Sequence, residues 1–348
     1  MKILHLTHHS GCLADIEYIT TKLGHNITSV YYDKGYNISH DLANSSWQEK
    51  KDIYNSYDVV ITSDTAPLSR IFLQNMDEFK GFLIVWICNR FDFCDKKNNS
   101  VGFPDKDYYS LLRKSLSHPR VKIIPNTEFD CYHTRRKNIN VENFIIKPIG
   151  KKLDNSINYV IPKSIPEKKE LFFIKNYHND TIFVDLEAKC KKLGIPAYRF
   201  KNRHGGTSDI ADFKGIIHIP YAWSTWLFFE NLQAGIPYFI PSRKFLLRIS
   251  IIQNILLLGK IFKKNFWFQN YYDSILFNWD RLKIAEWYCA ENSDVLVYFD
   301  SWNDLVEKIN NTDFRAQREK IKAWGEKHTT NTLQQWENVF DGISPLSN

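Results

Sequence analysis

The sequence predicts an α/β protein built from two Rossmann-like domains, each with a parallel sheet, which face each other across a cleft. Short runs rich in β-branched and aromatic residues recur along the 348-residue chain and alternate with polar segments of helix length. This alternation is typical of β-α-β units and parallel sheets covered by helices on both faces. A length of 348 residues favours two domains, each large enough for its own core.

The expected strands follow in order along the chain. In the first half they are residues 2–6, 27–32, 58–63, 82–88, 121–125 and 144–149. In the second half they are residues 171–175, 197–201, 215–219, 238–240 and 296–299. The run at 82–88 is apolar throughout, which indicates a central strand buried on both faces.

A segment at 151–169, rich in Lys, Pro, Asn and Ser, has neither helical nor strand periodicity. It predicts an interdomain linker between a first domain at 1–155 and a second at 165–315. The stretch at about 316–340 predicts an amphipathic helix that carries Trp324 and Trp336. Because two exposed tryptophans are costly, we expect this helix to pack back on the first domain.

Composition narrows the class of protein only partly. The formal net charge of +7 is compatible with anionic small substrates, membrane surfaces and nucleic acid alike. The six cysteines show no CxxC pair and no zinc-type spacing, which favours free thiols in a reducing compartment. The N-terminal apolar run is too short for a signal peptide, and no run of about 18 apolar residues exists. We therefore expect a cytoplasmic protein.

The strongest functional signal is the segment 221–242. A polar loop leads into a short helix with one acid, Glu230, and Gly235 ends that helix before an apolar strand. We expect the Glu230 carboxylate to face a cleft near the helix start, where it accepts paired hydroxyls such as those of a ribose. The Ser224 and Thr225 hydroxyls and nearby N–H groups would then meet phosphates.

Residues 229–242, FENLQAGIPYFIPS, resemble the apolar-Glu-x4-Gly-x-Pro-apolar pattern of GT-B glycosyltransferases of family 4. The resemblance implies the GT-B fold and a nucleotide-sugar donor such as a UDP- or GDP-sugar. It also implies that Glu230 accepts hydrogen bonds from the ribose, with no metal and no other cofactor. Retaining members carry a second glutamate eight positions earlier, where this chain has Ala222. The stereochemistry of the reaction is therefore open.

Two cations in the second half are candidates for the donor diphosphate. Lys175 ends one predicted strand, and Arg203 with the glycines at 205–206 follows the next. Cations at successive strand ends beside a helix N-terminus bind pyrophosphate by charge and N–H donation together. Family 4 enzymes commonly place Lys or Arg in these regions. The alternative is that Lys175 and Arg203 are solvated surface cations.

The loop after the first strand is not a GxGxxG fingerprint, so a dinucleotide is not indicated. The resemblance implies that Gly11 lets the backbone approach the donor. His9 and Asp15 are the nearest titratable groups. We expect His9, Asp15 and Asp92 to be catalytic, with Asp15 or Asp92 as the candidate base for an inverting reaction. A metal set that includes His8 and an ordinary loop and helix-cap role are the alternatives.

The loops after the fourth and fifth strands offer acceptor-binding groups. Arg90 and Asp92 follow the apolar fourth strand, and Asn126 follows the fifth. In open α/β sheets, ligands bind beyond the carboxyl ends of the strands, which favours these positions. A structural ion pair of Arg90 with Asp92, and helix capping after Asn126, are the alternatives.

The segment 243–272 holds six basic residues, no acid and many aromatic and aliphatic side chains. Such a segment suits the surface of a bilayer or a lipid-linked acceptor, and so predicts peripheral membrane contact. The other interpretation is an inserted helix whose apolar residues join the core while its lysines are solvated. Nucleic acid, held by backbone charge and base stacking, is the least favoured partner.

Together these features predict a metal-independent glycosyltransferase that moves a sugar from a nucleotide donor to a hydroxyl of a glycan or glycolipid. Two other functions stay open. A sugar-nucleotide epimerase of the same architecture would convert the donor without an acceptor. A non-catalytic protein would bind the nucleotide sugar without turnover.

Overall fold

The computed structural model describes residues 1–33, 38–88, 94–96, 100–102, 106–141, 144–153, 168–174, 184–201, 204–220, 222–249 and 282–343. The chain forms two compact units. Unit 1 comprises Met1–Ser156 and Thr329–Asn348, and unit 2 comprises Ile157–His328. Each unit contains one five-stranded sheet whose strands all run parallel. This confirms the predicted α/β class with two Rossmann-like domains.

The sheet of unit 1 has the strand order β2-β1-β3-β4-β7. Its strands are β1 (Lys2–Thr7), β2 (Asn26–Tyr31), β3 (Val59–Asp64), β4 (Phe82–Ile87) and β7 (Val121–Pro125). The helices are α1 (Ser10–Lys22), α2 (His40–Tyr54), η1 (Ala66–Ser69), α3 (Arg70–Leu73), α4 (Lys106–Ser115) and α5 (Glu128–Arg135). A small antiparallel pair, β5 (Cys94–Lys96) with β6 (Ser100–Gly102), completes the unit.

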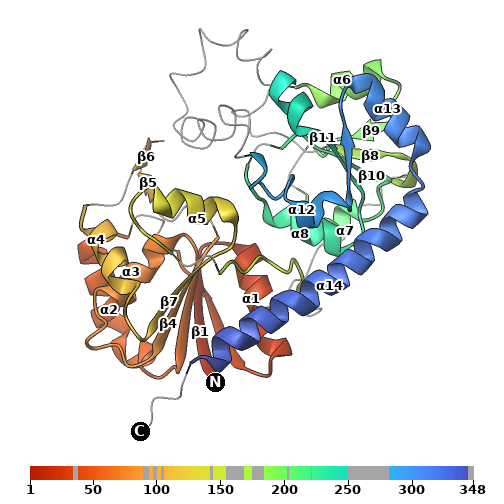
Figure 1. The fold of residues 1–348 in the computed structure, drawn as a ribbon. Coiled ribbons are helices and arrows are strands. Elements are labelled where there is room, and N and C mark those ends of the chain that lie inside the picture. Colours follow the sequence, from red (N-terminus) through yellow and green to blue (C-terminus); the bar gives the residue numbers. More distant parts are fainter. Residues whose placement is uncertain are drawn as a thin grey trace. The chain divides into compact units, whose positions relative to one another are not determined.

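Helices cover both faces of this sheet (Figure 1). Successive residues of a strand point to opposite faces, so Leu4 and Val60 join the core under α2, α3 and α4. There Trp47 packs edge-on against Phe72, with 6.2 Å between the ring centroids. Strand β4 is buried from its second residue to its last, as its unbroken apolar run predicts.

The other face of the sheet is covered by α1 and by the last turns of α14 (Phe314–Asp341). Trp86 of β4 and Trp336 of α14 are fully buried and meet edge to face, with ring centroids 5.5 Å apart. The C-terminal helix was predicted at about 316–340, and its residues from Thr329 onward belong to unit 1.

The segment 144–149 is not the predicted strand. Ile146 donates its N–H to the carbonyl of Pro125, and its own carbonyl accepts the Trp86 indole N–H at 2.9 Å. The N–H groups of Ile149 and Gly150 go to a side chain instead of a neighbouring strand. Ile146, Pro148 and Ile149 are buried and the other residues of the run are partly exposed, but its backbone bonds do not form a ladder.

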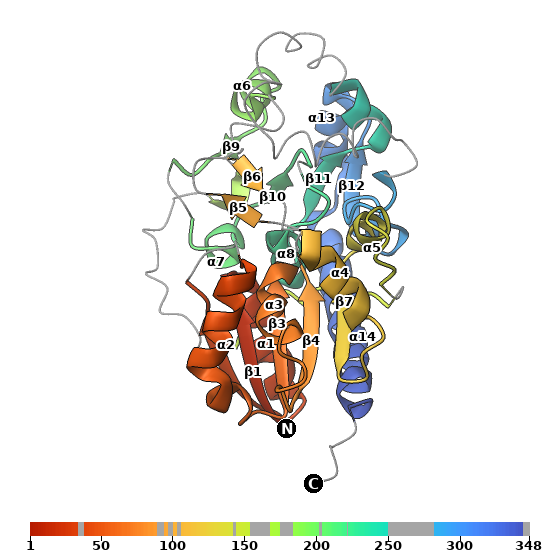
Figure 2. The same ribbon diagram turned by 90° about the vertical axis from the view of Figure 1, so that its left-hand side faces the viewer.

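The sheet of unit 2 has the strand order β12-β11-β10-β8-β9. Its strands are β8 (Phe172–Ile174), β9 (Ala197–Tyr198), β10 (Gly215–Ile217), β11 (Tyr238–Pro241) and β12 (Leu296–Phe299). The helices are η2 (Lys168–Glu170), α6 (Leu186–Lys192), α7 (Thr207–Ile210), α8 (Trp226–Gln233), α12 (Ala290–Ser293), α13 (Trp302–Asn311) and the first part of α14. Figure 2 shows these elements from a second direction.

Aromatic side chains fill the core of unit 2. Phe172 lies between Phe239 and Phe314, with ring centroids 5.5 and 6.0 Å away. Gly235 ends α8 with φ +72°, a left-handed conformation that favours glycine. The peptide N–H groups of Gly235 and Ile236 then close the helix end on the carbonyls of Leu232 and Asn231. This turn aims the chain into the buried strand β11.

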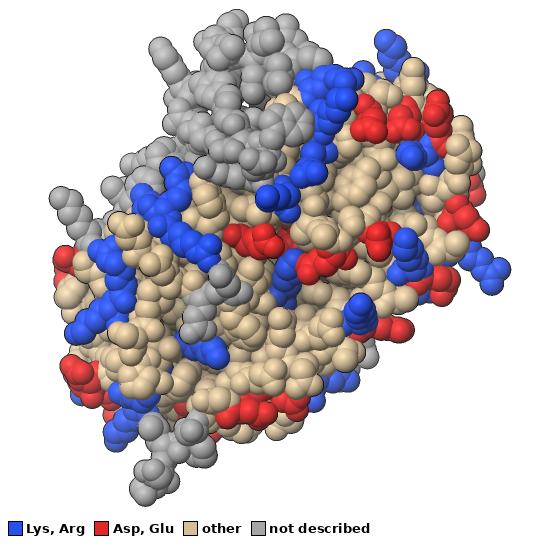
Figure 3. All heavy atoms as spheres, viewed as in Figure 1, with Lys and Arg blue, Asp and Glu red and all other residues tan. Residues whose placement is uncertain are grey.

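The described part of the basic segment, residues 243–249, is helical. Phe245, Leu246 and Ile249 are buried, whereas Arg243 and Arg248 are exposed. For these residues the core interpretation holds, and the rest of 243–272 lies outside the described residues. On the face shown in Figure 3, basic and acidic side chains both occur. Within the described chain, no helix has the length and apolar character needed to cross a bilayer.

Candidate functional site

Four neighbouring strands of unit 1 end at one edge of its sheet. Strands β1, β3, β4 and β7 lie side by side in that order, so the residues after their carboxyl ends share that edge. In parallel α/β sheets this edge is where ligands bind.

His9 caps the N-terminus of α1. Its Nδ1 accepts the peptide N–H groups of Gly11 and Cys12 at 3.1 and 3.3 Å. Because Nδ1 is the acceptor, the proton of a neutral ring sits on Nε2. The ring is exposed, and its engaged Nδ1 favours the helix-capping alternative over the predicted catalytic role. The N–H of Gly11 is already bound to His9, so this geometry does not favour Gly11 as the predicted backbone contact to the donor.

Asp15 lies one turn further into α1 and is fully buried. Its Oδ2 accepts the N–H of Ile149 at 2.9 Å, and its Oδ1 accepts the N–H of Gly150 at 2.8 Å. Burial raises the pKa of Asp15 to about 7, although the bonds from Ile149 and Gly150 oppose that rise. With no exposed surface and a backbone partner on each oxygen, Asp15 is placed for a structural role rather than the predicted catalytic one.

Two thiols lie beside His9 at the same edge. Burial opposes ionisation of Cys12, but hydrogen bonds with the Cys88 thiol and the His9 ring outweigh it and lower the pKa of Cys12 to about 6. Burial and the neighbouring Cys12 raise the pKa of Cys88 well above its ordinary value. Cys12 is 1% exposed. Cys12 therefore shapes the electrostatics around His9 without itself reaching solvent, whereas Cys88 is partly exposed.

Strain and unsatisfied polar atoms also mark this edge. Asp64, the last residue of β3, has φ +73°, which is a strained conformation for a residue with a side chain. Next to it, the buried Thr65 Oγ1 has no hydrogen-bond partner among the described residues, and neither has Asn126 Oδ1. A buried polar atom without a partner costs about 1–3 kcal/mol. Asn126 was predicted from the sequence to bind the acceptor, whereas Asp64 and Thr65 were not.

The remaining candidates in the first half of the chain are Arg90, Asp92 and His8. Arg90 and Asp92 lie outside the described residues, so their roles stay predictions. His8 Nδ1 lies 2.8 Å from the carbonyl oxygen of Tyr32. With His8 held by Tyr32 and Asp15 by the backbone, the described residues do not assemble the alternative metal set of His8, His9 and Asp15.

In unit 2, Glu230 is the fifth residue of α8 and is partly exposed. It lies a turn into the helix, not at its start as expected. Its Oε2 accepts the Thr207 hydroxyl at 3.4 Å. Thr207 begins α7 directly after Gly206, which has φ +98°. Glu230 therefore faces the glycine turn at 205–206, although the two lie more than 20 residues apart in sequence.

A chain of hydrogen bonds fixes this corner. The Thr207 hydroxyl also lies 3.0 Å from Asn231 Oδ1, and Asn231 Nδ2 donates to the Tyr238 hydroxyl at 2.8 Å. Asn231 is fully buried. The chain runs from α7 through α8 to strand β11, so it holds the face of α8 that carries Glu230 against the glycine turn.

At the start of α8, the N–H of Phe228 is bound to the Thr225 carbonyl at 3.0 Å. Thr225 is the residue before the helix, and its side chain makes no capping bond. Ser224 and Thr225 are both partly exposed. Uncapped N–H groups beside two hydroxyls suit an anionic group. Lys175 and Arg203, the predicted diphosphate ligands, lie outside the described residues.

One further group of possible metal ligands occurs in the described part of unit 2. Single ligand atoms of Glu286, Cys289 and Glu291 lie within 4.8 Å of one another. Cys289 Sγ lies 3.6 Å from Glu286 Oε2 and 3.8 Å from Glu291 Oε1. Asn292 Nδ2 also donates to Glu286. These contacts form a hydrogen-bonded cluster before strand β12.

No family model matches the chain, and no curated protein matches it. Among solved structures, the chain is similar to the crystal structure of the glycotransferase of kitacinnamycin, with 8% sequence identity and a TM-score of 0.48. The match covers 98% of each chain. At that identity and TM-score, the likeness carries no inference about the reaction or its residues.

Several residues at the sheet edge of unit 1 and around Glu230 in unit 2 were not predicted from the sequence. Asp64 and Thr65 follow a predicted strand, so a polar pair at a strand's carboxyl end was the available signal. Thr207 follows two glycines before a short helix, which is a weaker signal. Asn231 sits beside Glu230 in an apolar helix, where a buried amide indicates a required partner.

Proposed function

We propose that this protein is a glycosyltransferase that moves a sugar from a nucleotide-sugar donor to a hydroxyl of a glycan or glycolipid acceptor. The observation that carries the proposal is the corner of unit 2 where Glu230 faces the glycine turn and Thr207. A partly exposed carboxylate beside a strand's carboxyl end is the group needed to accept two ribose hydroxyls.

The donor would bind unit 2. Glu230 accepts hydrogen bonds from the ribose, and the uncapped start of α8 with Ser224 and Thr225 meets the diphosphate. Lys175 and Arg203 add positive charge to that diphosphate in this proposal. These groups neutralise the leaving group, so the proposal needs no metal ion and no other cofactor.

The acceptor would bind at the sheet edge of unit 1. The acceptor oxygen forms a bond to the anomeric carbon of the sugar, and the bond from that carbon to the diphosphate oxygen breaks. The hydroxyl proton passes to a base, for which Asp92 stays the candidate, and the nucleoside diphosphate leaves. His9 donates a hydrogen bond through Nε2, and Asn126 Oδ1 is an open acceptor for an acceptor hydroxyl.

Donor binding is tested by thermal shift with UDP-, GDP-, TDP- and CMP-sugars. A ligand at a hundredfold excess over its Kd stabilises the fold by about 2.7 kcal/mol. A charge-assisted hydrogen bond contributes about 1.5–3 kcal/mol, so Glu230→Gln should weaken binding roughly tenfold to a hundredfold. Glu319→Gln is the matched control, because Glu319 is exposed and pairs with Lys322 one turn away.

The outcomes separate the open functions. No stabilisation by any nucleotide sugar, or equal stabilisation of wild type and Glu230→Gln, would contradict donor binding at Glu230. A protein that converts the bound nucleotide sugar without an acceptor is an epimerase. One that binds it without any turnover is a binding protein, and mutation of Asp92 would then change nothing.

A further inference from the structure

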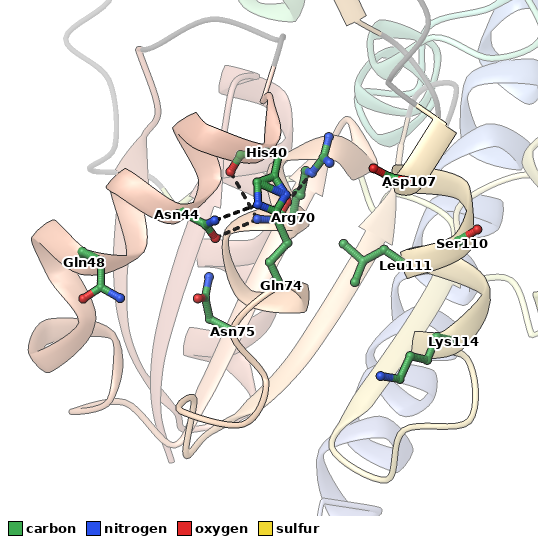
Figure 4. Close-up of a pocket in the computed structure, with 10 residues that line it drawn as sticks. All are labelled: His40, Asn44, Gln48, Arg70, Gln74, Asn75, Asp107, Ser110, Leu111 and Lys114. Atoms are coloured by element: carbon green, nitrogen blue, oxygen red, sulfur yellow. Dashed lines mark hydrogen bonds between the residues drawn. The ribbon is translucent and has the colours of Figure 1, made fainter.

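A polar groove of about 690 Å³ lies in unit 1 between α2 and α4 (Figure 4). We call it the α2–α4 groove. The groove exists because α3, the helix between α2 and α4, is short. Helix α3 is four residues long, Arg70–Leu73, so it spans only part of the distance that its two neighbours cover. The space beyond its end stays open and is lined by side chains of all three helices.

One wall of the groove is a polar face of α2. His40, Asn44 and Gln48 are spaced four residues apart, so they lie on one face of the helix. At 1.5 Å per residue this row is about 12 Å long. Gln48 is exposed and Asn44 is half-buried.

The floor is a hydrogen-bonded network that holds its groups in place. Arg70 is only 2% exposed, and its Nε donates to Gln74 Oε1. Gln74 Nε2 in turn donates to Asn44 Oδ1 at 2.8 Å and to the His40 carbonyl at 3.2 Å. Because these side chains are fixed before any ligand arrives, binding to them costs little side-chain entropy. Asn75 Nδ2 donates to the Ile71 carbonyl at 2.8 Å, which holds this side chain in place as well.

The opposite wall is the face of α4 that carries Asp107, Ser110, Leu111 and Lys114 (Figure 4). Asp107 and Lys114 are exposed and lie at the two ends of this face. Within the described residues, neither forms an ion pair. Leu111 is the one apolar side chain among the described lining residues.

The lining indicates the chemistry of the ligand. Four carboxamides contribute to it, and each carboxamide both donates and accepts hydrogen bonds, as sugar hydroxyls do. Apart from the His40 imidazole, the described lining residues hold no aromatic ring for a base to stack on. One lysine, one buried arginine and one aspartate do not form the cation cluster that a polyphosphate needs.

We propose that the α2–α4 groove binds a linear oligosaccharide through these carboxamides. Its assignment to the glycan acceptor, as the part beyond the reacting sugar, rests on the proposed function. The binding itself does not depend on sugar transfer.

Saturation-transfer difference NMR tests the groove with cellohexaose, maltohexaose and chitohexaose on the full chain. Two exposed positions allow variants that should fold normally. Gln48→Ala removes a carboxamide of the α2 wall, and Ser110→Trp fills the groove from α4. The matched control is Gln334→Ala, an exposed carboxamide of α14 whose Nε2 donates to Glu337 at 2.8 Å. We expect saturation transfer to at least one hexasaccharide, reduced severalfold in both groove variants and unchanged in the control.

The proposal is overturned if no hexasaccharide receives saturation, or if both groove variants bind as wild type does. Line broadening of inorganic pyrophosphate that is lost in Ser110→Trp, with no saccharide signal, would make the groove an anion site and also overturn it. The nucleotide-sugar thermal shift is measured on the same preparations. Donor binding without saccharide binding defeats only the groove proposal, whereas the reverse result defeats only the donor site.

Discussion

The Oδ1 atom of Asp15 lies 2.8 Å from the backbone nitrogen of Gly150, which is 135 residues further along the chain. Its other oxygen accepts the N–H of Ile149. A buried carboxylate of α1 thus fixes the segment that leaves the last strand of unit 1. Gly150 has φ +79°, so this segment turns at the point where it is held.

Replacing Asp15 by asparagine leaves one acceptor oxygen for two N–H groups. We expect Asp15→Asn to lower the free energy of unfolding by about 1–3 kcal/mol, because a buried N–H is then left without a partner. Urea unfolding followed by circular dichroism measures this loss. Asp41→Asn, at an exposed position in the first turn of α2, is the control and should change little. Equal stability of Asp15→Asn and wild type would contradict the structural role.

The same residue predicts a dependence of stability on pH. An aspartate has an ordinary pKa near 3.8, and burial raises the pKa of Asp15 to about 7 in the folded state. Between these pH values the folded state binds more protons than the unfolded state, so stability from this group falls as pH rises. The stability advantage of wild type over Asp15→Asn should therefore be largest near pH 4, shrink toward pH 7 and then level off. A difference that grows with pH would refute this.

Alanine substitutions at Gly235 and Gly194 distinguish the cost of backbone strain from the cost of a steric contact. Both have positive φ, +72° and +68°. A Cβ at Gly235 would meet Lys322 Cγ at 3.0 Å, whereas a Cβ at Gly194 would meet nothing within 4 Å. Each alanine variant should cost about 1–2 kcal/mol for the left-handed conformation. We expect Gly235→Ala to cost more than Gly194→Ala in denaturant unfolding, and equal costs would mean that Lys322 moves aside freely.

The Trp86–Trp336 contact should hold the last turns of α14 on unit 1. Trp336→Ala removes a fully buried ring and should cost about 3–5 kcal/mol. Trp336→Phe should cost much less, since Trp336 Nε1 has no hydrogen-bond partner among the described residues. Thermal unfolding of the two variants measures the difference. Similar losses in both would show that the indole N–H, not the packing, matters.

Thr207 should link the stability of unit 2 to donor binding. Thr207→Val removes the hydroxyl that lies 3.0 Å from the buried Asn231 Oδ1 and 3.4 Å from Glu230 Oε2. We expect a loss of about 1–3 kcal/mol in stability, and weaker stabilisation by the nucleotide sugar because Glu230 loses its neighbour. Thr207→Ser keeps the hydroxyl and should restore both. Donor binding by the serine variant that is as weak as that of Thr207→Val would contradict the role of the hydroxyl.

Most of the fold follows from local patterns in the sequence. The strands at 121–125 and 296–299 were predicted to the residue, and the other strands of both sheets to within a few residues. The exception is 144–149, where an apolar run is partly buried without joining a sheet. Burial is encoded by residue type, but the choice of backbone partner is not, because the N–H groups of Ile149 and Gly150 are taken by Asp15.

The candidate site was less accessible to sequence reasoning. Glu230 was selected by a motif whose parts are contiguous, and the helix, the glycine turn and the strand around it all form as expected. Its neighbour Thr207 comes from another helix. The opposite error occurred with Asp15, whose position near the first strand indicated catalysis until its contacts with the backbone were known. Proximity in sequence to a strand end does not reveal which way a side chain on the following helix points.

The sequence by itself determined the α/β class, the order of strands and helices, and the turn at Gly235, because each depends on residues that are neighbours in the chain. The tertiary structure alone decided that Asp15 is a buried support and that Glu230 faces Thr207. It alone also produced the groove between α2 and α4. The physical reason is that hydrogen bonds and cavities arise between elements distant in sequence, where many pairings satisfy the same hydrophobic pattern and only packing selects one.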